Sequence, residues 1–91
     1  MLRTPSSEPR DAAELALEAL GWLLADSLRA QRFLDLTGLT PDSLRGSLHH
    51  CATQAAVLDF LAAHEPDLEA AADSLGIAPQ ELAAARARLA C

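Results

Sequence analysis

The 91-residue sequence contains no tyrosine, and its aromatic residues are limited to Trp22, Phe33 and Phe60. β-branched residues are also few, whereas alanine and leucine dominate. This composition favours helices and argues against a sheet. The longest apolar run, residues 20–25, is far shorter than the ~20 residues that a membrane-spanning helix needs. The sequence therefore predicts an all-α chain of one domain, a compact bundle of five to six helices.

Lysine is absent too, so all seven basic residues are arginine, against thirteen aspartates and glutamates. A net charge of −6 argues against nucleic acid and anionic membranes as partners, because both attract basic surfaces. Residues 1–10 lack the apolar segment of a secretory signal. The two cysteines, Cys51 and Cys91, leave a disulfide open, but the missing signal favours reduced thiols. We therefore expect a cytoplasmic bacterial protein.

Apolar residues recur with a helical period along most of the chain. Residues 1–8 are polar and hold proline and serine, which predicts a disordered tail before a single helical domain over 9–91. In the second helix we expect Leu28, Phe33, Leu34 and Leu36 to face inward. The expected helices run from Pro9 to about 25, from Asp26 or Ser27 to Gly38, from Pro41 to about Leu48, from about His50 to Ala63, from Pro66 to Gly76, and from Pro79 nearly to the C-terminus.

Two corners of the chain share a glycine–aliphatic–x–proline pattern, in "TGLTPDSL" and in "LGIAPQEL". Glycine tolerates the left-handed backbone that ends a helix, and proline presets the first dihedral of the next helix. The pattern is therefore a way to turn a helix corner, and it does not require a recognition function. The residues expected to form these structural turns are Gly38, Pro41, Gly76 and Pro79.

A shift of thirty-eight residues aligns the two corners and several apolar positions without a gap. Trp22 then falls on Phe60, for example. The alignment favours two pseudo-repeated three-helix units, over 9–48 and 49–91. Chance similarity between leucine-rich helices is the alternative.

Residues 66–90 also have the outline of a DNA-reading helix-turn-helix. The second helix of that segment would present Gln80 and Arg88, residue types that read base edges, next to Glu81. The preceding helix carries aspartates and glutamates, which repel phosphates. We therefore prefer a packing corner and keep an atypical DNA-binding regulator as the alternative function.

Catalytic and metal-binding patterns find little support in the sequence. There is no nucleophile elbow, phosphate-binding glycine loop or H-E-x-x-H, so we expect no enzyme and no cofactor. The triplet "HHC" at 49–51, with His64 and Cys91 as further ligands, predicts no metal site, because adjacent helical residues point in different directions. Asp59 interrupts an apolar run, which indicates either a contact with Arg32 or Arg45 or an exposed strip.

The first helix is apolar over more of its circumference than a short monomer easily covers. If the side holding Leu15 and Trp22 stays uncovered, it is a surface for self-association or for a partner helix. Trp22 is the natural anchor, because tryptophan is enriched at interface hot spots. The alternative is that Trp22 fills the core. The preferred function is a non-enzymatic protein-interaction or self-association module, with an unidentified protein partner or a homodimer.

The chain resembles a family of short alphaproteobacterial proteins, classed as a domain of unknown function, in three segments: "ALEALGWLLAD" (16–26), "QRFLDLTGLTPDSLR" (31–45) and "AAVLDFLAAHEPDL" (55–68). The distinctive motifs are R-F-L-x-L-T-G-L and A-V-L-D-F-L, in that order, and the match spans about 12–84. The family often has Asp-Pro ahead of the second motif, where this chain has "HHC". The resemblance implies a small all-helical cytoplasmic protein, and it implies no activity, cofactor or catalytic residue.

Overall fold

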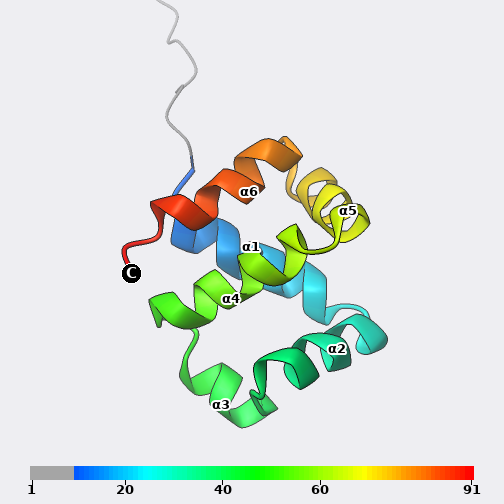
Figure 1. Cartoon of the computed structure of the whole chain (residues 1–91), viewed down its shortest axis with the longest axis vertical. Helices are drawn as coiled ribbons and strands as arrows, with labels where there is room; N and C mark the ends of the chain where they lie inside the picture. Colours follow the sequence, from blue (N-terminus) through cyan, green and yellow to red (C-terminus); the bar gives the residue numbers. More distant parts are fainter. Residues whose placement is uncertain (1–9) are drawn as a thin grey trace, which may run out of the picture.

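The computed structural model describes residues 10–91, and within this range it contains six helices and no strand (Figure 1). The all-α prediction is confirmed. The expected tail 1–8 and Pro9 lie outside the described residues, but the expected start of the first helix is wrong, because residues 10 and 11 are not helical and Asp11 caps a helix that begins at Ala12. None of the described helices is long and apolar enough to cross a membrane. The helices are α1 (Ala12–Leu24), α2 (Ser27–Thr37), α3 (Pro41–Gly46), α4 (Cys51–Ala62), α5 (Glu65–Leu75) and α6 (Pro79–Arg88).

Helix α1 lies at the centre of the bundle and contacts α2, α4, α5 and α6 (Figure 1). Its first turn is capped by Asp11, whose carboxylate accepts a hydrogen bond from the Glu14 amide at 3.0 Å. Its fully buried side chains belong to Leu15, Ala16, Ala19 and Leu23. Neighbouring helices therefore cover the wide apolar surface of α1 on several sides.

The segment before α1 is tied to the C-terminal helices. The Arg88 guanidinium donates a hydrogen bond to the Arg10 carbonyl at 2.8 Å. Arg10 in turn donates to the Leu75 carbonyl at 3.4 Å and pairs with Glu18. These contacts join the start of α1 to the end of α5 and to α6.

Both glycine corners adopt the expected geometry. Gly38 and Gly76 have positive φ angles of 77° and 75° and end α2 and α5 in the left-handed conformation. Pro41 and Pro79 occupy the first positions of α3 and α6. At the first corner Thr40 and Ser43 add a reciprocal capping box.

The helix bounds follow the shift of thirty-eight residues: α2 moves onto α5, and the starts of α3 and α6 coincide. The two halves nevertheless pack differently. Helix α6 contacts α1, α4 and α5, whereas α3 ends at Gly46, two residues earlier than expected, and has few contacts with other helices. The same local layout is therefore packed against both α1 and α4 in one half, whereas in the other half α3 has few neighbours (Figure 1).

Candidate functional site

The two residues expected at a partner interface lie in different environments. Leu15 is completely buried in the core, beneath the helices that surround α1. Trp22 is half-buried and packs against the edge of the core. Leu15 is therefore inaccessible to a partner in this fold, and Trp22 offers only part of its ring.

Trp22 has a contact within its own chain that covers one face of the indole. The Arg29 guanidinium lies 3.6 Å from the ring centroid, a cation–π arrangement. Arg29 also donates to the Trp22 carbonyl at 2.6 Å and to the Leu23 carbonyl at 3.3 Å. A side chain of α2 thus satisfies the last carbonyls of α1 and fixes the corner between the two helices.

The outer face of α2, defined by Leu28, Arg32 and Leu36, carries apolar side chains in solvent. Leu28 is 80 % exposed and Leu36 is 72 % exposed, so the expectation that both face inward is wrong. The reason is the helical period: Phe33 is fully buried, and residues 28, 32 and 36 follow each other at four-residue intervals on another side of the helix. That i, i+4, i+8 spacing was the sequence signal for this surface.

A groove of about 390 Å³ lies between the outer face of α2 and the end of α4. Its apolar lining comes from Leu36, Phe60 and Ala63, and its polar lining comes from Arg32 and His64. The Arg32 guanidinium lies 5.4 Å from the Phe60 ring centroid. The outer face of α2 is therefore not flat, and its Leu36 end continues into a depression.

Asp67 of α5 anchors Arg32 and His64, the two polar side chains of this groove. Its Oδ2 accepts a hydrogen bond from Arg32 at 2.9 Å and lies 3.1 Å from His64 Nδ1. Only one N–H of the Arg32 guanidinium is used in this contact, and the side chain stays half exposed. Arg32 therefore keeps donors for a further acceptor.

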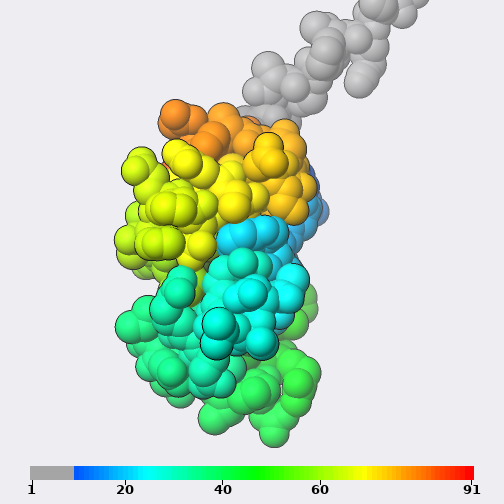
Figure 2. Space-filling model, turned by 90° about the vertical axis from the view of Figure 1, so that its right-hand side faces the viewer, coloured from blue at the N-terminus to red at the C-terminus, as the bar shows by residue number. Residues whose placement is uncertain are grey.

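The charge of the chain is unevenly distributed. Residues 26–46 hold three aspartates and three arginines and are neutral, whereas residues 65–91 hold five carboxylates and two arginines, a net charge of −3. Figure 2 shows the α2 residues on the lower half of the surface and the α5 and α6 residues on the upper half. The exposed leucines thus belong to the neutral end of an acidic molecule.

A family model described as a protein of unknown function, DUF3572, matches residues 9–91. The chain belongs to the DUF3572 family. This agrees with the resemblance inferred from the three sequence segments. No curated protein and no solved structure matches this DUF3572 chain.

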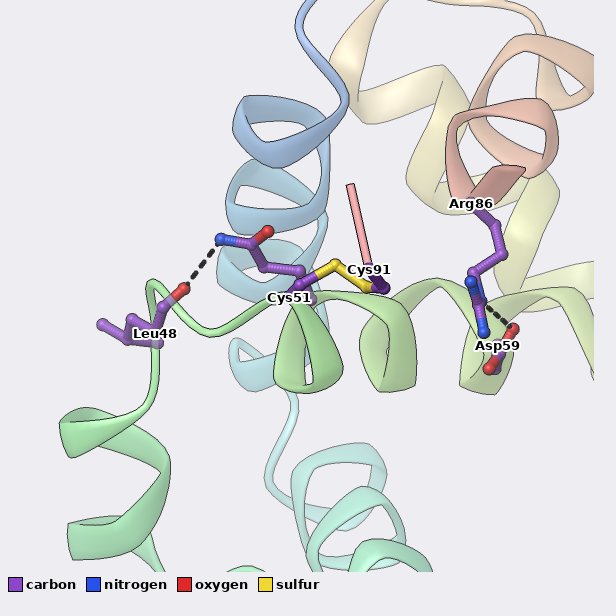
Figure 3. Close-up of a disulfide and its surroundings, with 6 residues drawn as sticks. Leu48, Cys51, Asp59, Arg86 and Cys91 are labelled. Carbon is purple, nitrogen blue, oxygen red and sulfur yellow. Dashed lines mark hydrogen bonds and ion pairs between the residues drawn. A yellow bond between two sulfur atoms is a disulfide. The ribbon is translucent and has the colours of Figure 1, made fainter. Parts of the chain in front are cut away.

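The cysteines of this DUF3572 chain form a disulfide, so the expectation of reduced thiols is not what the structure shows. Cys51 begins α4 and Cys91 follows α6, and their Cα atoms are 5.5 Å apart (Figure 3). Forty residues separate them in sequence, but the antiparallel return of α6 along α4 brings them together. Sequence spacing alone does not reveal such a contact.

The start of α4 is held by polar contacts next to the disulfide. Gln54 is buried and donates through Nε2 to the Leu48 carbonyl at 3.0 Å (Figure 3). His49 and His50 are exposed, and His50 precedes α4 without a side-chain cap. Within residues 10–91, no three histidine, cysteine or acidic side chains gather as metal ligands. The "HHC" triplet therefore contributes its cysteine to a cross-link.

The arginines of α6 are engaged within the DUF3572 chain. Arg88 donates to Arg10, and Arg86 Nε donates to Asp59 Oδ1 at 3.0 Å (Figure 3). The expected partners of Asp59, Arg32 or Arg45, are thus wrong, because Asp59 lies on the side of α4 that faces α6, whereas the neighbouring Phe60 faces α2. Asp59 is exposed, as the alternative expectation had it.

Proposed function

We propose that this DUF3572 chain is a non-enzymatic protein-interaction module that binds its partner through the outer face of α2. The observation that carries this proposal is the exposure of Leu28 and Leu36 on one stripe of a folded domain. A third exposed leucine, Leu24 at 41 %, ends α1 just before α2. Clustered exposed apolar side chains mark interaction sites more often than they mark ordinary surface.

The energetic reason for a partner is the water that these leucines contact. Removing a leucine side chain from water contributes about 1.5–3 kcal/mol, so covering Leu28 and Leu36 supplies a sizeable part of an association free energy. The helix that carries them is already formed in the folded chain, which lowers the entropy lost on binding. The chemistry of the surface supports binding rather than catalysis, since leucines supply no acid, base or nucleophile.

The proposed partner is a protein and not a nucleic acid. Residues 66–90, the helix-turn-helix alternative, carry a net charge of −2, and both arginines of α6 already form hydrogen bonds within the chain. Phosphate contacts supply much of the affinity for DNA, and they require free cations. A gel shift with pooled DNA fragments at low salt should therefore show no complex.

The cytoplasm is the proposed compartment, although the Cys51–Cys91 disulfide argues against it, and the cysteines therefore provide the test. A cytoplasmic protein is exposed to thiols that reduce disulfides, whereas an oxidising compartment preserves them. Cysteines should be alkylated in intact bacteria before lysis, and the protein then resolved by mass. Two alkylated cysteines, Cys51 and Cys91, would support the cytoplasm, and an intact disulfide would contradict it.

Site-specific photocrosslinking tests the interaction proposal directly. A photoreactive amino acid in place of Leu28 should give covalent adducts in intact cells. The same amino acid in place of Ala84, an exposed residue of α6, should give far fewer. Adding Leu36→Ser to the Leu28 probe should reduce the adducts, because it removes half of the apolar stripe. Equal labelling from both positions, or none from position 28, would contradict the proposal.

A further inference from the structure

We infer that the partner at the outer face of α2 is a second copy of this chain, with the two α2 helices packed antiparallel about a twofold axis near Arg32. The inference rests on the proposed function, because it names the occupant of the same surface. It commits the molecule to a closed homodimer rather than to an open-ended assembly. The reasons are the spacing of the leucines, the order of the charges and the neutrality of this end.

The leucine spacing is symmetric about Arg32. Leu28 precedes it by four residues and Leu36 follows it by four, which places each leucine about 6 Å along the helix axis from Arg32. In an antiparallel pair centred on Arg32, Leu28 of each copy therefore lies opposite Leu36 of the other. A single symmetric contact therefore covers both exposed leucines of each copy.

The charges of the same helix are complementary to themselves. Asp35 lies one turn after Arg32, and its Oδ1 is held by Gln31 at 2.9 Å. The antiparallel arrangement brings Arg32 of each copy within reach of Asp35 of the other. Arg32 has donors beyond the one given to Asp67, and Asp35 has a second carboxylate oxygen. Two reciprocal ion pairs then lie between the two Leu28–Leu36 contacts.

The charge distribution favours a second copy over a basic foreign partner. A basic protein would be attracted to residues 65–91, where the net charge is −3, rather than to the neutral residues 26–46. Two copies of an acidic protein must meet where neither contributes excess negative charge. The outer face of α2 belongs to that neutral region. Asp67 of the adjoining α5 is paired with Arg32, and salt screens the remaining repulsion.

A charge exchange tests this geometry. Arg32→Asp and Asp35→Arg each place two like-charged pairs in the symmetric dimer, and each should raise its dissociation constant roughly tenfold or more. Mixing the two variants should restore association, because every pair across the mixed dimer is then of opposite charge. Light scattering and native mass spectrometry of the separate and mixed proteins measure this pattern. Arg45→Asp, which changes the same charge on α3, is the matched control and should leave the dimer intact.

Arg32→Asp also loses the contact with Asp67, so the fold of each variant should be checked by circular dichroism. If that variant does not fold, Asp35→Arg provides the test alone. It should dissociate as a pure protein and associate better with the wild type, which supplies one favourable pair, than with itself. A wild-type chain that stays monomeric, or a mixture that shows no preference, overturns the inference.

The photocrosslinking experiment separates this inference from the proposed function. Adducts from position 28 with twice the mass of the chain support both. Adducts of another mass leave an interaction module standing but overturn the homodimer. The absence of adducts contradicts both.

Discussion

Helices α2 and α3 and helices α5 and α6 share one local layout and differ in almost everything else. Each pair consists of an eleven-residue helix, a left-handed glycine and a proline-started helix. Yet α5 and α6 lie against α1 and α4, whereas α2 exposes leucines and α3 contacts little. The residues at each corner determine its backbone geometry, but they do not determine how much of the corner is buried.

Side-chain size accounts for part of the difference. The fully buried residues of α5 and α6 include Ala71, Ala72 and Ala85, whose small side chains let these helices approach their neighbours closely. The position that corresponds to Ala71 in the first half is Phe33. Its ring inserts into the core edge-on against Phe60, with centroids 5.3 Å apart. One large side chain thus anchors α2 in the core, whereas several small side chains pack α5 against its neighbours.

Opening the disulfide should cause the largest loss of stability, and this loss should affect α5 and α6 rather than α2 and α3. The Cys51–Cys91 loop contains α4, α5 and α6 and leaves α2 and α3 outside. For a separation of forty residues, Cys91→Ser should lower the free energy of unfolding by about 4 kcal/mol in the chain-entropy description. Urea denaturation measures this loss.

Amide hydrogen exchange shows in which helices this stability is lost. In the intact protein the amides of α3 should exchange faster than those of α6, and opening the disulfide should narrow that difference. A dithiol added to the wild type should reproduce the effect of Cys91→Ser, and added to the variant it should do nothing. Unchanged protection of α6 after reduction would mean that the cross-link does not hold this region.

The second prediction compares equivalent leucines of the two regions. Leu82 of α6 is fully buried among four helices, so Leu82→Ala should cost about 3 kcal/mol. Leu44→Ala in α3 should cost less, nearer to about 2 kcal/mol, because the surroundings of a peripheral helix can collapse into the space. Thermal and denaturant unfolding of both variants give the values. An equal or larger loss at Leu44 would show that α3 is as firmly packed as α6.

Substitutions at the glycine corners should change the unfolding free energy less, because they act only through the backbone conformation. Gly76→Ala should destabilise by about 1–2 kcal/mol, because a side chain opposes the left-handed backbone at φ 75°. Gly76→Val should cost more, and Gly38→Ala should cost about as much as Gly76→Ala. The control is Gly21→Ala within α1, where nothing lies within 4 Å, and there alanine should stabilise by roughly 0.5–1 kcal/mol. Unfolding free energies of these variants would test the assignment, and a neutral Gly76→Ala would contradict it.

The smallest effect on stability should come from the most exposed residues. Leu28→Ser and Leu36→Ser should each change the unfolding free energy of the monomer by less than about 0.5 kcal/mol. Their counterparts in α5, Pro66 and Ser74, are already non-leucine residues. Denaturation at high dilution measures the monomer alone. A large loss would mean that these leucines pack within the monomer.

The sequence predicted the helices and their corners because both depend on neighbouring residues. Capping by Asp26, positive φ at Gly38 and proline at a helix start need no knowledge of distant contacts. The facing of α2 and the pairing of Cys51 with Cys91 depend on which helices lie side by side. For α2 the apolar pattern permits two orientations, and burial of Phe33 decides between them.

The contact between Arg29 and Trp22 gives the molecule an internal optical reporter. Trp22 is the sole tryptophan, and no tyrosine competes with its emission. Its ring lies under the Arg29 guanidinium, where α1 meets α2. Separation of α2 and α3 from the rest of the chain would uncover the indole and change its emission, while changes confined to α5 and α6 would leave the signal steady. The fluorescence of the unmodified protein can thus follow the separation of α2 and α3 independently of changes in α5 and α6.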